Sequence, residues 1–239
     1  MNETLKKVLQ YFILPIAIIA LAWAWWSGIQ KPVNFDKEKE ARSQVAIQRL
    51  KDIRDLQVAY KSANGKFAST LDSLILFYNT GKLDVVLQVG SKDDSLAVVK
   101  TDAIKKDLKN KNRKITDAEI QQNLYDRYLK GERVIATVKT QVNVKDTLFN
   151  NRENFVVDSI KYIPFSGKQE VEMESIVKKV SGVDVPLFEA RMPYKALLNG
   201  MDRQLIINLI DERVNSFNQY EGLMVGSVNN PNNNAGNWE

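Results

Sequence analysis

The feature that most constrains this chain is an uncharged segment of 23 residues that begins at Val8. As a helix, with a rise of about 1.5 Å per residue, this segment would span roughly 34 Å, slightly more than the apolar core of a bilayer. Trp23, Trp25 and Trp26 gather at one end of it, where amphipathic rings favour the headgroup region. We therefore expect residues 1–30 to form a cytoplasmic tail and a single transmembrane anchor.

Two alternatives for this segment stay open. A cleaved signal peptide would use Lys6 and Lys7 as its basic region and the small-x-small pattern at residues 22–24 as its cleavage site, although the apolar run is longer than usual. A fully buried core helix is the other. Basic residues flank both ends of the segment, so charge alone does not set its orientation. We favour an inner-membrane protein whose N-terminus is cytoplasmic and whose C-terminal domain is periplasmic.

A second helix is expected beyond Lys31-Pro32, because proline disfavours helical geometry in the residue before it. Apolar residues then recur every three or four positions and form one helix face, at Ile47, Leu50, Ile53, Leu56 and Tyr60. Asn64-Gly65 is expected to end this helix in a left-handed cap. We expect residues 53–60 to pack in the domain core and residues 41–50, nearer the membrane, to contact a partner.

The order of the remaining patterns predicts an α+β fold, with a single N-terminal transmembrane helix, a long amphipathic helix and then a mainly antiparallel sheet with a helical insertion. Residues 31–81 are expected to form a helical part, which includes a short helix capped by Ser69 or Thr70. Residues 82–228 form an α+β periplasmic domain with a charged insertion at 92–131. Residues 229–239 form an Asn-rich tail.

Runs of β-branched or alternating residues locate the strands of this sheet. They predict strands at 83–89, 133–149, 154–165, 171–180 and 185–192. Residues 203–214 fit either a helix or a strand, because their apolar period is helical while their centre is rich in isoleucine. The Asn-rich tail cannot bury enough apolar surface to fold alone, so we expect it to lie along the surface with Trp238 as its hydrophobic contact.

Two short segments carry a resemblance to known families. The stretch from Arg49 to Ile75 runs from the long helix through the turn Asn64-Gly65-Lys66-Phe67 into the short helix, and the sequence closes with Ala235-Gly236-Asn237-Trp238-Glu239. These segments resemble the first helix and turn of type IV pilins and type II secretion pseudopilins, and the Gly-Asn-Trp ending of major pseudopilins. The chain also resembles a group of envelope proteins from Bacteroidota that share its RDLQVAYKS, NGKF, MDRQLIINL and NNNAGNWE segments.

The resemblance to pilins has defined limits. The prepilin leader and the Phe-Thr-x-x-Glu start of the pilin helix are not found in this sequence, and the helix is expected to break at Lys31-Pro32. What the resemblance implies is therefore a pilin-like domain on a permanent anchor, rather than a processed filament subunit. An unrelated membrane-tethered α+β domain can begin with the same kind of helix and cap, and that alternative stays open.

The composition of the 239 residues excludes several classes of chemistry. The chain contains no cysteine and no histidine, which rules out disulfides, thiol nucleophiles, Ser-His-Asp triads and zinc sites built from Cys or His. Its glycines lack the spacing of nucleotide-binding loops. Its carboxylate pairs are typical of solvated surface charge. We therefore expect no enzymatic activity, no cofactor and no metal site.

The most unusual polar segment is residues 100–114, where seven basic residues face only Asp102 and Asp107, for a net charge of +5. Such a segment can be solvated surface, contact anionic lipid or phosphate, or order against a partner. It holds no aromatic residue for base stacking, so we expect no nucleic-acid partner. The residues predicted to contact partners are Ile47, Leu50 and Ile53 in the helix, Lys105, Lys106 and Lys109 in the insertion, and Trp238 in the tail.

These features together favour a structural or scaffold subunit of an envelope machine, either pilus-like or secretion-related. Its expected partners are the lipid bilayer and other membrane or periplasmic proteins of one assembly. An alternative is an accessory subunit that docks on a membrane enzyme or translocase through its transmembrane helix. A hydrolase that relies on carboxylates is a third hypothesis.

Overall fold

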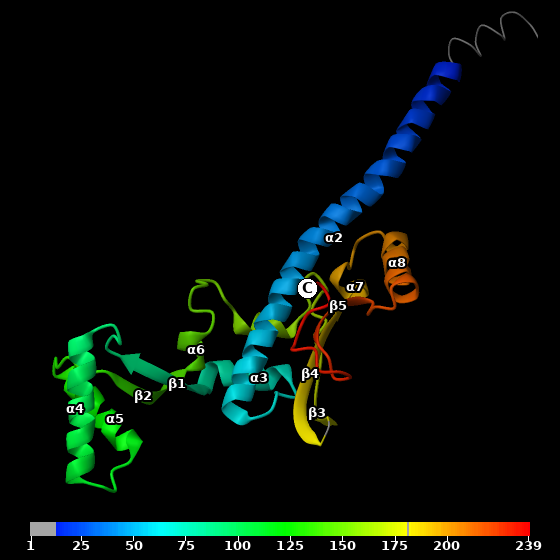
Figure 1. Cartoon of the computed structure of the whole chain (residues 1–239). Helices are drawn as coiled ribbons and strands as arrows, with labels where there is room; N and C mark the ends of the chain where they lie inside the picture. Colours follow the sequence, from blue (N-terminus) through cyan, green and yellow to red (C-terminus); the bar gives the residue numbers. More distant parts are fainter. Residues whose placement is uncertain (1–12, 181) are drawn as a thin grey trace, which may run out of the picture. The chain divides into compact units, whose positions relative to one another are not determined.

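The computed structural model describes residues 13–180 and 182–239, and the chain divides into two compact units. Unit 1 comprises Met1–Val58, Lys66–Ser73 and Val156–Glu239, and unit 2 comprises Ala59–Gly65 and Leu74–Phe155. The coarse prediction of an α+β chain with a long N-terminal helix and antiparallel sheets is confirmed (Figure 1). The segment 82–228, expected to be one domain, is shared between the two units.

The long helix α2 runs without interruption over Leu14–Asn64. The predicted break at Lys31-Pro32 is wrong, because Pro32 lies inside the helix. A helical proline removes one backbone hydrogen bond and crowds the carbonyl four residues before it, here that of Gly28. The remaining bonds of a helix of 51 residues are untouched by this single loss. At its other end, α2 closes as predicted, with Gly65 at a φ of 75° and its N–H donating to the Lys61 carbonyl at 2.8 Å.

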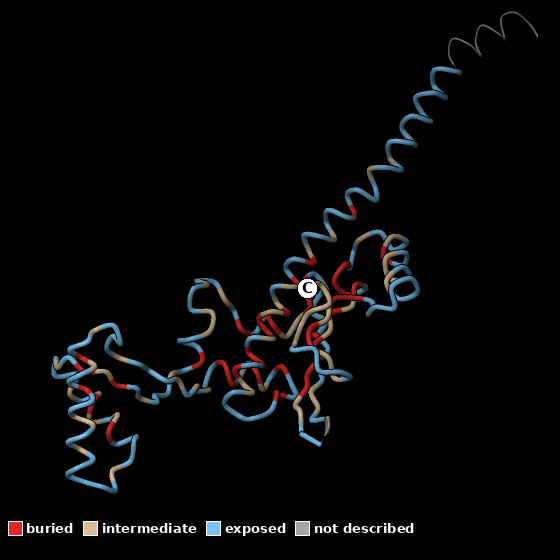
Figure 2. The backbone as a smooth tube through the Cα atoms, in the orientation of Figure 1, coloured by how far each residue is buried: buried red, intermediate tan, exposed pale blue. Residues whose placement is uncertain are grey.

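Figure 2 shows the first part of α2 mostly in the colour of exposed residues, and its large apolar side chains are exposed to solvent. Their exposed fractions run from 47% at Ile29 to 73% at Trp25. Within the described residues, no helix combines the length and the apolar character needed to cross a membrane. Residues 1–12, which hold the start of the predicted anchor, lie outside the described part of the chain.

Unit 1 contains a three-stranded antiparallel sheet in the order β3-β4-β5. Its strands are β3, Glu172–Val180; β4, Val183–Pro193; and β5, Gly222–Gly226. The first two match predicted strands. β5 is not among the predicted strands, because five residues with a glycine at each end show no alternation of apolar and polar side chains. It becomes a strand by pairing with β4 and is almost entirely buried.

One face of this sheet is turned toward α2. The register places Ala190 of β4 opposite both Met173 of β3 and Val225 of β5, and Ala190 and Val225 are fully buried. The side-chain amide of Gln57 on α2 lies 3.2 Å from the Met173 sulfur. Since residues opposite one another in a ladder share a face, these side chains identify the α2 side of the sheet as the core of unit 1.

The predicted strand at 154–165 is wrong. Its centre is a 3₁₀ helix, η2, over Val157–Lys161. Val157, Ile160 and Ile163 are all buried, and they are spaced three residues apart. Side chains three apart lie above one another in a 3₁₀ helix, so the period of this segment is three rather than the two of a strand. Pro164 also lacks the N–H that a strand ladder needs.

Unit 2 contains a two-stranded antiparallel ladder of β1, Lys82–Val89, and β2, Ala136–Asn143. Two helices lie between these strands in sequence, α4 over Ser95–Lys111 and α5 over Asp117–Leu129, as expected for the helical insertion. The unit has its own core, in which Ile120 and Leu124 of α5 pack with Val134 and Ala136. Partly buried side chains from β1 and α4 complete this core.

The remaining elements are short. They are α3 over Leu71–Thr80, α6 over Val144–Thr147, α7 over Tyr194–Leu197, α8 over Arg203–Asp211, and the π-helical turn η3 over Glu212–Ser216. The hydroxyl of Thr70 accepts from the Ser73 N–H at 3.2 Å, so Thr70 is the predicted cap of α3. Asp202 caps α8 in the same way. Residues 203–214, which fitted either a helix or a strand, are helical and belong to α8 and η3.

The C-terminal tail pairs with the outer edge of β5. The Gly226 N–H donates to the Ala235 carbonyl at 3.0 Å, and the Asn237 N–H donates to the Met224 carbonyl at 3.0 Å. The Asn237 side chain accepts from the Met224 N–H and donates to the Gly222 carbonyl. Asn237 thus acts as a clamp that satisfies both kinds of backbone group on an otherwise open sheet edge.

We predict that Asn237→Ala destabilises unit 1 by about 1–3 kcal/mol, because it leaves partly buried backbone groups of β5 without partners. Urea denaturation followed by circular dichroism measures this as a lower midpoint at an unchanged slope. Asn230→Ala is the matched control, since Asn230 lies exposed in the same tail. Equal midpoints for the two variants would contradict the clamp.

Candidate functional site

The helix positions predicted to contact a partner lie mainly in the core of the folded chain. Leu50, Ile53 and Leu56 have no exposed surface, whereas Ile47 and Tyr60 are half-buried. The division of this face into a core half and a partner half is therefore not retained, because Leu50 is as fully buried as Leu56. Side chains buried by their own chain have no surface left for a partner.

The predicted tail contact, Trp238, is half-buried. Its ring lies over Gly236, in the space that a Cβ at that position would occupy. Next to it, the Glu239 carboxylate pairs with Arg54 of α2 at 2.6 Å. This hydrogen bond from Arg54 lowers the pKa of Glu239. Trp238 thus contributes to fastening the tail within unit 1.

The three insertion lysines all lie on α4, with different surroundings. Lys105 lies 3.8 Å from Asp102, and Lys109 lies 3.3 Å from Asp117 at the start of α5. Lys106 is exposed and forms no ion pair among the described residues. Of the three, Lys106 therefore presents a full positive charge to solvent.

Lys106 lies at the end of an apolar stripe on the outward face of α4. Leu96, Val99, Ala103 and Lys106 follow one another at spacings of three, four and three residues, which places them on one side of the helix. The inward side is marked by the buried Ala97 and Thr101. Leu96 and Val99 are 65% and 68% exposed, so two large apolar side chains project from a highly charged segment.

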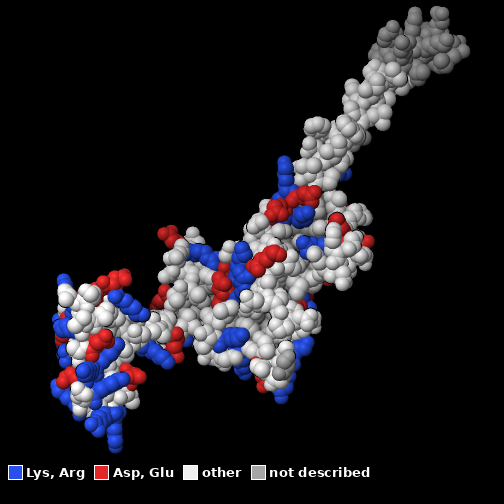
Figure 3. All heavy atoms as spheres, viewed as in Figure 1, with Lys and Arg blue, Asp and Glu red and all other residues white. Residues whose placement is uncertain are grey.

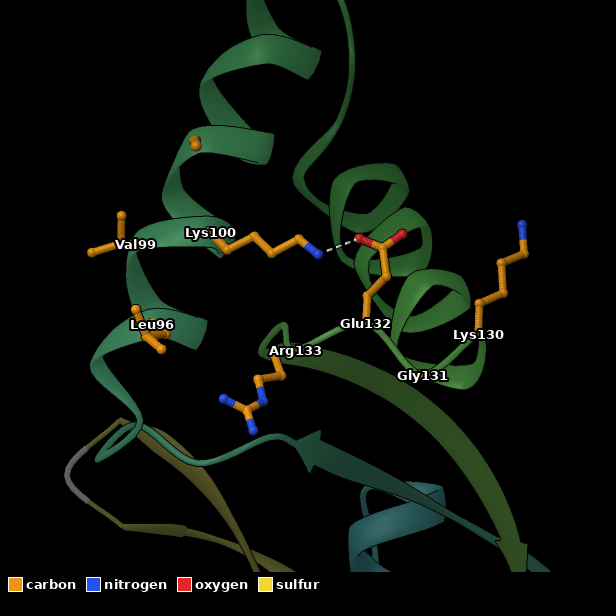
Figure 4. A pocket seen from close by; sticks show the side chains of 8 residues that line it. Leu96, Val99, Lys100, Lys130, Gly131, Glu132 and Arg133 are labelled. Carbon is orange, nitrogen blue, oxygen red and sulfur yellow. Dashed lines mark ion pairs between the residues drawn. The ribbon is translucent and has the colours of Figure 1, made fainter.

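A shallow depression lies beside this stripe, with a volume of about 660 Å³. Leu96, Val99, Lys100 and Ala103 line it from α4, and residues 130–133 line it from the loop between α5 and β2 (Figure 4). Lys100 reaches across it to Glu132 at 2.8 Å.

The ion pair leaves the depression with a positive rim. The hydrogen bond from Lys100, with a smaller contribution from Arg127, holds the pKa of Glu132 below its usual range, so this carboxylate is charged at neutral pH. Glu132 is thus already shared by two cations. Lys130 and Arg133 form no ion pair with other described residues and remain as net positive charge.

Local sequence signals explain why these elements form. Asp94 caps α4 by accepting from the Leu96 and Ala97 N–H groups. Thr116 and Glu119 cap α5 reciprocally, and the Thr116 N–H donates to the Glu119 carboxylate and lowers its pKa. Gly131, with a φ of 85°, allows the tight turn that carries the chain from α5 to the loop below the depression.

The charge of the chain is concentrated in unit 2. Unit 2 holds 16 basic and 11 acidic residues, whereas unit 1 holds 18 of each, so the whole net charge of +5 belongs to unit 2. Figure 3 shows Lys and Arg side chains gathered over α4 and α5. We call the surface formed by Leu96, Val99, Ala103, Lys106, Lys130 and Arg133 the α4 surface.

Sequence reasoning identified Lys106 but missed the apolar part of the α4 surface. The signal was present as Leu96 and Val99, two large apolar residues next to a strongly basic segment. Lys130 and Arg133 could not have been added from sequence, since only the fold brings them to the depression. Within the described residues, no group of three or more acidic side chains is placed to hold a metal ion.

The α4 surface thus combines three features of a binding surface: an apolar stripe, a shallow depression, and cations at its rim that form no ion pair with other described residues. Comparison of the chain with known protein families, with curated proteins and with solved structures finds no match.

Proposed function

We propose that this protein is a non-enzymatic scaffold subunit of an envelope machine, anchored in the inner membrane through the first part of α2. The observation that carries the proposal is the exposure of that part: large apolar side chains from Ile13 to Ile29 are 47% to 73% exposed. Burying one such side chain stabilises a structure by about 1.5–3 kcal/mol. We therefore expect lipid or another protein to cover this run.

A bilayer is the cover that fits this run best. The exposed side chains are Ile13, Leu14, Ile16, Ile18, Ile19, Leu21, Trp23, Trp25, Trp26 and Ile29, and their spacing leaves no polar face. A protein partner would cover one face of a helix, whereas lipid covers all faces. In sequence the uncharged run begins still earlier, at Val8.

In this proposal the N-terminus is cytoplasmic and both folded units are displayed in the periplasm. α2 would connect the bilayer directly to the core of unit 1, because the same uninterrupted helix supplies the buried Leu50 and Ile53. A rigid connection of this kind suits a scaffold that holds other components at a set place. The resemblance of the Asn64-Gly65 turn to pilins and pseudopilins suggests a pilus-like or secretion-related assembly.

We predict that the full-length protein stays in the membrane pellet after alkaline carbonate washing. Replacing both Ile18 and Leu21 with arginine should move it to the supernatant, because each arginine at a helix centre opposes insertion by about 2.5–3.5 kcal/mol. The matched control replaces Val33 and Val45, two exposed positions of the same helix beyond the uncharged run. Extraction of the unaltered protein, or a mature chain that starts near Trp25, would contradict the anchor.

A second measurement separates the scaffold from its alternative. After purification in mild detergent, mass spectrometry identifies the proteins that accompany the chain. Recovery with pilus-like or secretion components is the expected result. Recovery in fixed proportion with a respiratory enzyme or a translocase would instead assign the chain as an accessory subunit that docks through its anchor.

A further inference from the structure

The α4 surface combines protruding apolar side chains with unpaired positive charge. Leu96 and Val99 are each about two thirds exposed, Lys106 lies on the same side of α4, and Lys130 and Arg133 line the depression beside them. In Figure 4, Val99 projects away from Glu132. Neither the net charge of the chain nor its anchor explains why large apolar side chains are exposed at this place.

We infer that the α4 surface is a second membrane-contact site, which binds the headgroup layer of a bilayer rich in anionic lipid. Apolar tips insert at the boundary between headgroups and acyl chains, and the flanking cations meet the anionic headgroups. This inference goes beyond the proposed anchor, because it concerns a separate unit and a lipid class that the anchor does not distinguish.

Charge complementarity favours anionic lipid as the occupant. All of the net positive charge of the chain lies in unit 2, and the carboxylate nearest to the depression, Glu132, is neutralised by Lys100 and Arg127. The long stems of Lys106 and Lys130 can lie along an apolar surface while their ammonium groups stay among phosphates. Cations therefore border the apolar tips, as an anionic headgroup layer requires.

The shape of the α4 surface favours a bilayer over an acidic protein. The apolar stripe of α4 is short, since Lys106 follows Ala103 one turn later, and its side chains project rather than line a deep groove. A protein helix would need a longer apolar groove to seat its anchor residues. Shallow insertion among lipid headgroups requires only a few projecting apolar side chains.

The test places one fluorophore on the α4 surface and another elsewhere on unit 2. The chain has no cysteine, so Val99→Cys and Gln122→Cys each give a single labelling position. Val99 lies on the α4 surface, whereas Gln122 is exposed on α5 and lies outside that surface. Each full-length protein, labelled with an environment-sensitive dye, is mixed with vesicles of phosphatidylcholine alone or with added phosphatidylglycerol.

The expected result is a blue shift of the Val99 label only on vesicles that contain phosphatidylglycerol, with no change at Gln122 on either kind. Raising the salt concentration from about 0.1 M to about 1 M should reverse the shift, because the screening length falls from about 10 Å to about 3 Å. A Val99 label that stays in water on anionic vesicles, or two labels that respond alike, would overturn the inference. The first of these outcomes would leave the surface to an acidic protein partner.

Charge variants test the same inference through the lipid dependence. Neutralising Lys106 and Lys130 with glutamine should weaken the response of the Val99 label about fivefold for each basic residue lost. The matched control neutralises Lys139 and Lys145, two exposed lysines of the same unit that lie outside the α4 surface. Equal weakening by both pairs would show that net charge alone is sensed and would overturn the assignment to this surface.

The vesicle experiment also separates this inference from the anchor. Flotation with neutral vesicles reports on the first part of α2, whatever the labels show. A chain that floats only with anionic vesicles, with a shifted Val99 label, would contradict the anchor and support the α4 surface. A chain that floats with both kinds of vesicle and shows no blue shift of the Val99 label would support the anchor and contradict lipid binding by the α4 surface.

Discussion

Replacing Ile53 with aspartate is expected to unfold unit 1. Ile53 lies at the centre of the buried face of α2 and has no exposed surface. The variant loses about 1.5–3 kcal/mol of apolar burial and must also bury a carboxylate without a partner, which costs several kcal/mol more. Together these losses are comparable to the whole stability of a typical domain, about 5–15 kcal/mol.

Thermal unfolding of the full-length protein in detergent, followed by circular dichroism, measures this loss. Val45→Asp is the matched control, because Val45 is also a β-branched residue of α2 but is 44% exposed. The control should change the midpoint little, since surface substitutions usually fall within about 0.5 kcal/mol of neutral. Similar midpoints for the two variants would mean that this face of α2 does not form the core of unit 1.

Replacing Gln57 with leucine is expected to destabilise unit 1 by about 2–4 kcal/mol, although the change makes the helix face more apolar. Gln57 is fully buried and clasps the backbone of Ala68 from both sides. Its Nε2 donates to the Ala68 carbonyl at 2.9 Å, and its Oε1 accepts from the Ala68 N–H at 2.8 Å. Leucine would leave both backbone groups buried without partners.

Urea denaturation should show a lower midpoint for Gln57→Leu, and hydrogen exchange at the Ala68 amide should be faster. Gln44→Leu is the matched control, because Gln44 is exposed and bonds only to Glu40 on the same helix. If the two variants unfold at the same midpoint, the clasp contributes nothing and the turn after α2 is held by Phe67, whose ring lies 4.7 Å from that of Phe188.

Gln57 also shows where sequence reasoning fails for the core. A glutamine beside Leu56 in a helix is normally assigned to the solvated side, and only the position of Ala68, eleven residues later, gives its amide partners. The apolar residues of the same face were predicted because their spacing is visible locally. The difference is that apolar burial follows from a period, whereas polar burial follows from the location of one particular partner.

Pro32 and Ile160 illustrate the same distinction for secondary structure. Proline was expected to end a helix, but the long helical segments on either side of Pro32 outweigh a single lost bond. Val157, Ile160 and Ile163 are β-branched, which favours a strand by composition, yet all three are buried in or just after a 3₁₀ turn. At Pro32 the intrinsic preference was outweighed by the continuous helix around it, and at residues 157–163 it was outweighed by burial against other parts of the chain.

The sequence by itself determined several helix ends and the excluded chemistry. Thr70, Asp94, Thr116 and Gly65 act on backbone groups within a few residues, so the helix ends that they set are visible without a fold. The lack of cysteine and histidine, the uncharged run from Val8 and the basic segment at 100–114 are likewise properties of the chain alone.

Only the tertiary structure decided which distant segments belong together. Three features join residues far apart in sequence: β5 pairs with β4, the tail returns to β5, and Lys130 and Arg133 lie beside the first half of α4. The tertiary structure also divided the chain so that one unit carries all of the net charge. The physical reason is that burial and strand pairing depend on which residues come together in space. The residues next to a position in the sequence do not specify that partner.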